Sequence, residues 1–251
     1  MALTEVRKGQ RITYRSGDAE IIAYLSQPTT PGTHPGMVVI QPVHGLTPYL
    51  EIVADHLADQ GYVAIAPALY SRLGTITTDS SSGVPPEARA LSNQTPDPQV
   101  VADLRAAIDY LQGLPSVGTQ QKIGGCGFCA GGRHGLFLMA AEPRVAAFVA
   151  FYPTVTDEQP QPHRPTLVWD VIKDIRGSVC VLIGDRDEPT VEKYRERLRK
   201  ALEEHGIDYE YHLYGGGLHG FSNGGSDHYQ EHIARAAWAV ADDYLARKLK
   251  G

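Results

Sequence analysis

The chain has 251 residues, of which 42% are hydrophobic and 21% charged, and this composition is ordinary for a globular protein with a buried core. The formal net charge of -6 and the absence of basic stretches other than residues 246–250 argue against a nucleic-acid partner. No apolar run is long enough to span a membrane and residues 1–10 lack a signal-peptide core, so we expect a cytoplasmic protein.

The predicted elements alternate between strands and helices after an N-terminal hairpin that turns at Gly17-Asp18. The alternation of residues and the continuous apolar runs predict strands at residues 11–14, 20–26, 37–40, 62–66, 122–126, 145–151, 179–183 and 208–214. Helices are expected at residues 48–60, 98–112, 129–141, 190–204 and 227–248, with Asp97 as N-cap of the second. This order predicts a single α/β domain over residues 1–251, with a mostly parallel sheet of about eight strands and helices on both faces.

Two long segments interrupt this alternation. Residues 71–98 are rich in Ser, Thr, Pro and Gly and lack helical periodicity, and residues 152–176 are loop-like except for a short helical piece near 170–175. Connections of this length in a compact domain are typically functional, and loops carry substrate choice on α/β scaffolds. We expect both segments to cover the site. The substrate-binding candidates in or beside them are Tyr70, Arg89, Arg133 and Tyr152, and either arginine could hold a substrate carboxylate.

The central motif is Gly127-Phe128-Cys129-Ala130-Gly131, between a predicted strand and a predicted helix. It matches the nucleophile-elbow pattern G-x-S-x-G, with Cys in the place of Ser. An elbow lifts the side chain above the sheet at a helix N-terminus, where the helix dipole favours a thiolate. Cys129 is therefore the candidate nucleophile and the backbone N–H of Ala130 a candidate oxyanion donor. The alternative is a tight turn in which Cys129 is a small buried residue.

Three other patterns compete with this interpretation. Cys126 and Cys129 form a C-x-x-C, which is typical of thiol oxidoreductases, but Cys126 falls at the end of a predicted buried strand and the chain is far longer than a thioredoxin-type domain needs. An odd number of cysteines, three, fits a reducing compartment without a disulfide framework. Residues 125–130 match a dinucleotide-binding fingerprint, but no acidic residue ends the next strand. Residues 228–232 read His-x-x-Glu-His, a zinc-peptidase pattern, but too few residues follow to supply the further ligand. We therefore expect neither a cofactor nor a metal, and the two histidines lie on the surface of the last helix.

Acidic and histidine candidates follow the motif in the order that an α/β-hydrolase requires. The strand at 179–183 is followed by the acidic residues Asp185, Asp187, Glu188 and Glu192, among which the residues themselves leave the choice open. The strand at 208–214 is followed by three glycines and His219, which indicates a freely bending loop that delivers an imidazole. Active sites of open α/β sheets lie at the carboxyl ends of strands, so these side chains are expected to converge.

Taken together, the chain resembles the dienelactone hydrolase (carboxymethylenebutenolidase) family over nearly its whole length. The similarity rests on residues 59–64, 102–111 and 127–132, on Gly184-x-x-Asp187 and on Leu218-His219-Gly220-Phe221. The resemblance implies an α/β-hydrolase fold and hydrolysis of an ester or lactone. It implies a triad of Cys129, Asp187 and His219, and a second oxyanion N–H at Val43.

Two positions depart from the family pattern. Pro42, beside His44, stands where members commonly carry a glutamate, and Asn223 stands where members that take dienelactone use an arginine. The resemblance therefore implies the reaction class more strongly than that substrate. A thiolate is a good leaving group, so a Cys129 thioester mechanism favours enol lactones and aryl esters over amides.

The expected partner is a small-molecule ester or lactone, with no nucleic acid or membrane, and the expected state is a monomer or small homo-oligomer. Two alternatives stay open. One is a non-catalytic ligand-binding or sensor protein on the same fold. The other is a thiol oxidoreductase that uses Cys126 and Cys129.

Overall fold

The computed structural model describes residues 8–78, 83–157 and 160–251. In them, eight strands form one sheet in the order β1-β2-β4-β3-β5-β6-β7-β8. The strands are β1 (Gln10–Ser16), β2 (Ala19–Ser26), β3 (Gly36–Ile40), β4 (Val63–Pro67), β5 (Ile123–Phe128), β6 (Val145–Phe151), β7 (Ser178–Arg186) and β8 (Tyr209–Leu218). The β1–β2 and β2–β4 pairs are antiparallel and the other pairs are parallel. The prediction of a mostly parallel sheet with an N-terminal hairpin is confirmed.

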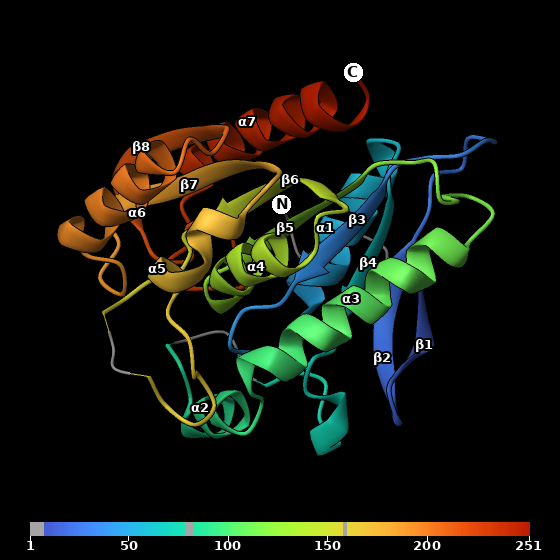
Figure 1. The fold of residues 1–251 in the computed structure, drawn as a ribbon, viewed down its shortest axis with the longest axis horizontal. Coiled ribbons are helices and arrows are strands. Elements are labelled where there is room, and N and C mark those ends of the chain that lie inside the picture. The colour runs from blue at the N-terminus through green and yellow to red at the C-terminus, as the bar shows by residue number, and fades with distance from the viewer. Residues whose placement is uncertain (1–7, 79–82, 158–159) are drawn as a thin grey trace.

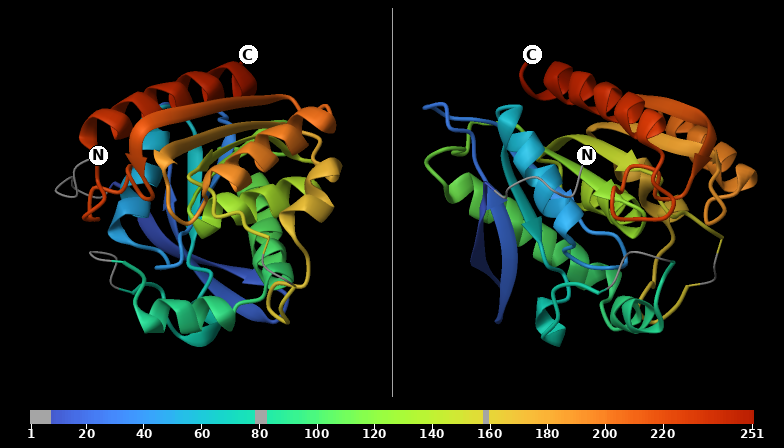
Figure 2. Two further views of the ribbon diagram at one scale, coloured as in Figure 1. Left: turned by 90° about the vertical axis from the view of Figure 1, so that its left-hand side faces the viewer. Right: turned by 180° about the vertical axis from the view of Figure 1, so that it is seen from behind.

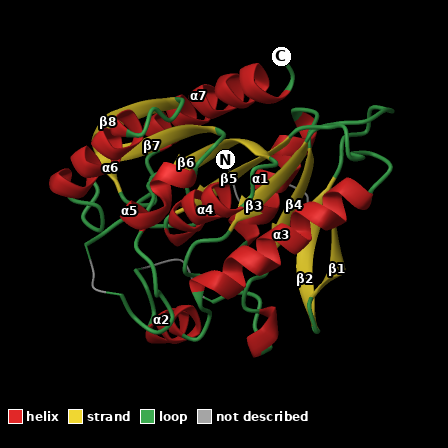
Figure 3. Ribbon diagram, in the orientation of Figure 1, coloured by secondary structure: helices red, strands yellow, loops and turns green. Residues whose placement is uncertain are grey.

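Helices cover both faces of the sheet, as Figures 1 and 3 show. They are α1 (Pro48–Asp59), α2 (Pro86–Asn93), α3 (Asp97–Gly113), α4 (Ala130–Ala141), α5 (Val168–Val171), α6 (Glu192–Glu204) and α7 (Glu231–Leu249), with short 3-10 turns at Ser71–Leu73 and Ile172–Asp174. Helices α1 and α7 lie on one face, seen in front in the right-hand view of Figure 2. They are joined there by a bond between His56 Nε2 and Asp242 Oδ1 of 2.9 Å. Helices α3 to α6 lie on the other face.

The central strands are apolar on both sides because helices exclude water from both faces. Every residue of β3, β4 and β5 is buried. Burial of this kind explains why continuous apolar runs located these strands in the sequence. No helix in the described part of the chain is long and apolar enough to cross a membrane.

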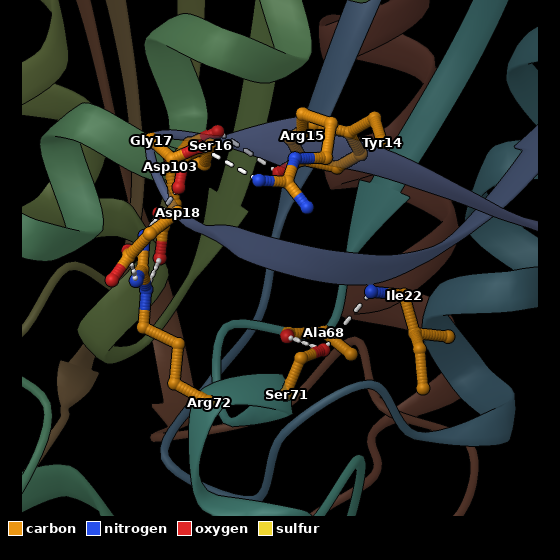
Figure 4. Close-up of polar contacts among 10 residues, drawn as sticks. All are labelled: Tyr14, Arg15, Ser16, Gly17, Asp18, Ile22, Ala68, Ser71, Arg72 and Asp103. Carbon is orange, nitrogen blue, oxygen red and sulfur yellow. Dashed lines mark hydrogen bonds and ion pairs between the residues drawn. The ribbon is translucent and has the colours of Figure 1, made fainter.

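Arg72 fixes the beginning of the long segment after β4 to the hairpin and to α3 (Figure 4). Its Nη2 donates to the Ser16 carbonyl at 2.9 Å and to Asp103 Oδ1 at 2.8 Å. Ser71, next to it, accepts a hydrogen bond from the Ile22 N–H at 3.1 Å. Asp103 is fully buried, so its charge is balanced by this arginine, and the polypeptide leaves β4 in a fixed direction.

Four sequence expectations about elements are wrong. Residues 71–98 contain α2, which buries Ala88 and Leu91. Asp97 is the first helical residue of α3 rather than its N-cap, because its carboxylate is bound elsewhere. The three glycines at 215–217 continue β8 instead of forming a loop. The last helix begins at Glu231, so His228 precedes it and the two histidines of the His-x-x-Glu-His pattern do not share a helix face.

Candidate active site

Cys129 occupies a strained turn between β5 and α4. Its φ is 57°, in the left-handed region, where a non-glycine residue costs about 1–3 kcal/mol. The turn is tight because its flanks approach closely. A Cβ on Gly127 would lie 2.3 Å from the Gly131 carbonyl oxygen, and one on Gly131 would lie 2.3 Å from the Ile40 carbonyl oxygen. The thiol therefore stands above the carboxyl edge of the sheet, at the N-terminus of α4.

His219 and Asp187 converge at the same edge from the ends of β8 and β7. His219 Nδ1 donates to Asp187 Oδ2 at 2.9 Å, and Asp187 Oδ1 accepts from the Thr190 N–H at 2.8 Å. Asp187 is buried and both of its oxygens are occupied, which fixes the imidazole. Asp185 is exposed and accepts instead from the Gly216 N–H at 2.7 Å. Of these two acids, the structure brings Asp187 to the histidine.

The thiol and the imidazole influence each other's charge. Burial alone would raise the pKa of the Cys129 thiol, but the nearby His219 imidazole, the Thr154 hydroxyl and the Ala130 N–H outweigh it and lower the pKa. Burial would lower the pKa of His219, yet the thiolate and Asp187 raise it well above its usual value. Cys129 Sγ lies 3.4 Å from Thr154 Oγ1. These directions favour a thiolate–imidazolium pair.

The loop after β3 forms a second wall beside the thiol. A turn is closed by a bond from the Gly45 N–H to the Pro42 carbonyl at 3.1 Å, and the Tyr70 hydroxyl donates to the Val43 carbonyl at 2.8 Å. The chain after β4 returns to this loop, where the Thr78 N–H donates to the His44 carbonyl at 2.8 Å. The peptide around Val43 is thus held in position on both sides.

A cavity of about 810 Å³ lies over the thiol. Both long segments contribute to its lining, residues 71–98 through Arg89 and residues 152–176 through Arg164. Most of the predicted site residues line it, namely Val43, His44, Arg89, Cys129, Ala130, Arg133, Tyr152, His219 and Asn223. Tyr70 does not line this cavity, and Asp187 lies behind His219. Among the described lining residues, Glu188 is the single carboxylate, whereas four are arginines.

Arg133 lines the cavity, but its guanidinium forms an ion pair with Asp97. Its Nη1 donates to Asp97 Oδ1 at 2.8 Å, and His134 Nε2 donates to the same oxygen at 3.1 Å. Burial would raise the pKa of Asp97, but these two partners hold it far below its usual range. The Asp97 N–H also donates to the His163 carbonyl at 2.9 Å. Asp97 therefore joins α3, α4 and the segment before α5.

The predicted candidate Tyr152 lies beside the histidine, among neighbours that the sequence did not indicate. Tyr152, whose φ is 37°, places its ring edge against His219 with the centroids 5.2 Å apart. Its hydroxyl lies 2.7 Å from Ser222 Oγ, which also accepts from the Tyr49 hydroxyl at 2.9 Å. His228 Nδ1 donates to the His219 carbonyl at 2.9 Å. Thr154 was not predicted either, and the sequence signal that could have found it is its place shortly after the carboxyl end of β6.

The second cysteine of the C-x-x-C pattern lies apart from the cavity. Cys126 is fully buried in the middle of the sheet, opposite Val39 and Val149 on the neighbouring strands. Burial raises the pKa of its thiol strongly. A thiol in this environment is a poor nucleophile and is out of reach of a substrate.

The family model, the relatives and the solved structure that match this chain have related names. The model of the Dienelactone hydrolase family matches residues 21–249. A protein of Synechocystis sp., provisionally named a carboxymethylenebutenolidase, is 30% identical over 244 residues that cover 95% of this chain and 96% of the relative. A Bradyrhizobium sp. protein, provisionally named a 2-oxo-3-(5-oxofuran-2-ylidene)propanoate lactonase, is 27% identical over 230 residues, which cover 92% of this chain and 90% of its own. The crystal structure of a Klebsiella pneumoniae protein, provisionally named a dienelactone hydrolase, matches with a TM-score of 0.88 and 26% identity, covering 97% of this chain and 100% of that one.

Proposed function

Since this chain belongs to the dienelactone hydrolase family, we propose that it hydrolyses an ester or lactone with Cys129 as nucleophile, His219 as base and Asp187 as the residue that orients the histidine. The observation that carries the proposal is the convergence of three groups at one edge of the sheet. These are a strained thiol at a helix N-terminus, a partly buried histidine joined at 2.9 Å to a buried aspartate, and a cavity open to both the thiol and the imidazole. This set meets the needs of nucleophilic catalysis.

The reaction proceeds in two steps. The Cys129 thiolate attacks the carbonyl carbon, and the backbone N–H groups of Val43 and Ala130 receive the negative oxygen. The C–O bond breaks, His219 Nε2 gives its proton to the departing oxygen, and a thioester on Cys129 remains. His219 then takes a proton from water, whose oxygen attacks the thioester carbon. The C–S bond breaks, the acid is released, and the Cys129 thiolate and the protonated His219 are restored. Asp187 keeps the Nδ1 proton in place throughout, so that Nε2 is the atom that exchanges protons.

The cavity favours a substrate that carries a negative charge. Arg89 and Arg186 line it, Glu188 is the single carboxylate among the lining residues that the structure describes, and Arg133 is bound to Asp97. The relative named as a lactonase acts, by its name, on a propanoate, which is a carboxylate. We therefore propose a carboxylate-bearing lactone or activated ester, held by Arg89 and Arg186.

Hydrolysis of an activated aryl ester by three forms of the protein tests the proposal. Wild type and Cys126→Ala are expected to turn over, since Cys126 is buried in the sheet and does not line the cavity. Cys129→Ala is expected to lose activity by about 10³-fold or more. The assay contains a metal chelator, so that hydrolysis by an adventitious metal is removed. An active Cys129→Ala variant contradicts the proposal, and a requirement for Cys126 favours a thiol oxidoreductase.

A further inference from the structure

Three side chains that bind metals in other proteins meet on the face of the sheet beneath α7. Cys180 of β7 stands directly opposite Glu210 of β8, and His212 follows Glu210 by two residues. Side chains two apart on a strand point to the same face, so His212 shares that face with Glu210. Each of the three offers one donor atom, and these atoms all lie within 4.8 Å of one another.

The donor set suits one class of ion. A thiolate, an imidazole and a carboxylate are the ligands of Zn²⁺, with bonds of about 2.0–2.3 Å. Bonds of that length in a tetrahedron separate the ligand atoms by about 3.5 Å, so movements of about 1 Å close the present arrangement around an ion. A thiolate and a carboxylate also balance the charge of a divalent cation. Hard cations such as Mg²⁺ and Ca²⁺ prefer oxygen ligands and do not match this set.

Glu210 is already oriented toward the centre of the group. Its Oε1 accepts from Arg247 Nη2 at 2.8 Å, and its Oε2 lies 3.4 Å from His212 Nε2. Arg247 is itself held by Asp243, with its Nε 2.7 Å from Oδ2. Partners that occupy one carboxylate oxygen and leave the other oxygen directed at the ion are usual around metal ligands.

We propose that Cys180, Glu210 and His212 form a site for a divalent transition-metal ion, zinc by its donor set, with water as the fourth ligand. The ion enters from solvent past His212 and Glu210, whose side chains are 36% and 30% exposed. The site is separate from the hydrolytic one, because Cys180 lies near the start of β7 and Asp187 directly follows its end, seven residues or roughly 20 Å further on. The ion fastens the edge strand β8 to β7.

Titration with Co²⁺ as a spectroscopic substitute for zinc tests the proposal on the full chain. The background variant is Cys129→Ser, which removes the one cysteine that is not fully buried. One equivalent of Co²⁺ is expected to produce a thiolate-to-cobalt charge-transfer band. Cys180→Ala is expected to remove that band, and His212→Gln to weaken Co²⁺ binding by about tenfold or more. The matched control, His205→Gln at an exposed position after α6, should bind as the background does.

Thermal unfolding gives a second measurement. Zn²⁺ at about 100 times its dissociation constant should raise Tm by roughly 5 °C or more, and His212→Gln should abolish this rise. If Cys180→Ala does not fold, the partly exposed Glu210→Gln and His212→Gln variants decide the outcome. Absence of the band, or a band that survives Cys180→Ala, overturns the proposal. Neither readout depends on ester hydrolysis, so either outcome leaves the proposed function intact.

Discussion

Replacement of Asp187 by asparagine separates its electrostatic role from its place in the fold. The Thr190 N–H, 2.8 Å from Oδ1, needs an acceptor, so the amide oxygen of Asp187→Asn must face Thr190. The amide NH₂ then faces His219 Nδ1, where the carboxylate now accepts a hydrogen bond at 2.9 Å. His219 must therefore carry its proton on Nε2. In that tautomer Nε2 cannot take a proton from Cys129 or from water.

The expected loss is large because the histidine is held in the wrong tautomer and also loses a stabilising charge. Asp187 contributes to the raised pKa of His219, so its neutralisation weakens the thiolate–imidazolium pair as well. The same substitution in serine proteases lowers kcat by about 10⁴, and we expect a loss of about 10³–10⁴ here. This corresponds to about 4–5.5 kcal/mol in the activation barrier, at about 1.36 kcal/mol per factor of ten.

Initial rates of aryl ester hydrolysis, normalised to folded protein by circular dichroism, measure the effect. Asp185→Asn is the matched control, because Asp185 is exposed and its Oδ1 accepts only from the Gly216 N–H. It should retain activity within about threefold of wild type, as surface substitutions do. The reasoning is refuted if Asp187→Asn keeps more than a tenth of the wild-type activity, or if Asp185→Asn loses as much.

Three further predictions concern the pair, the oxyanion loop and the elbow. The pKa of Cys129 is lowered and that of His219 is raised, so alkylation of Cys129 should be fast at neutral pH. The alkylation rate should fall only as the pH drops through the lowered thiol pKa. A midpoint of the wild-type rate profile near the free-thiol pKa of about 8.5 contradicts this prediction. In His219→Ala the midpoint should move to higher pH. Tyr70→Phe removes a 2.8 Å hydrogen bond to the Val43 carbonyl in the loop after β3 and should lower kcat by about tenfold with KM nearly unchanged. An unchanged kcat would show that this hydrogen bond does not hold the oxyanion loop in position. Gly131→Ala places a Cβ 2.3 Å from a carbonyl oxygen of β3 and should lower the free energy of unfolding by about 3 kcal/mol or more. The control Gly113→Ala places its Cβ in open space and should not lower it. Denaturant unfolding measures both variants.

Local patterns were sufficient for most of the fold. Buried strands such as β3 and β6 are continuous apolar runs, and the elbow at Cys129 is specified by glycines that only a tight turn requires. The order of nucleophile, acid and histidine follows from the fold and needs no distances. Each of these features depends on a short stretch of the chain or on the order of such stretches, so the sequence alone could indicate it.

The failures came from contacts between distant segments. Helix α2 has only Ala88 and Leu91 as buried residues, which is too weak a periodic signal to detect. The glycines after residue 214 remain in β8 because Gly217 and Gly184 meet across the strands, where a Cβ on Gly184 would lie 2.0 Å from the Gly217 oxygen. A close approach of this kind cannot be seen in either segment by itself.

Individual side chains were misjudged for the same reason. Asp97 has the chemistry of an N-cap, but Arg133 and His134 on α4 bind its carboxylate. Thr154 and His228 reach the site only through the packing of their segments against Cys129 and His219.

The junction at Asp97 has a consequence for how substrate range can change. One residue bonds to the elbow helix through Arg133 and His134 and to the opposite cavity wall through the His163 carbonyl. The two walls that select a substrate are therefore mechanically linked to each other and to the turn that aims the nucleophile. Mutations in one wall will be epistatic with mutations in the other. Directed evolution of new specificity should accordingly vary both walls together and leave Asp97 unchanged, so that remodelling of the walls does not disturb the aim of the thiol.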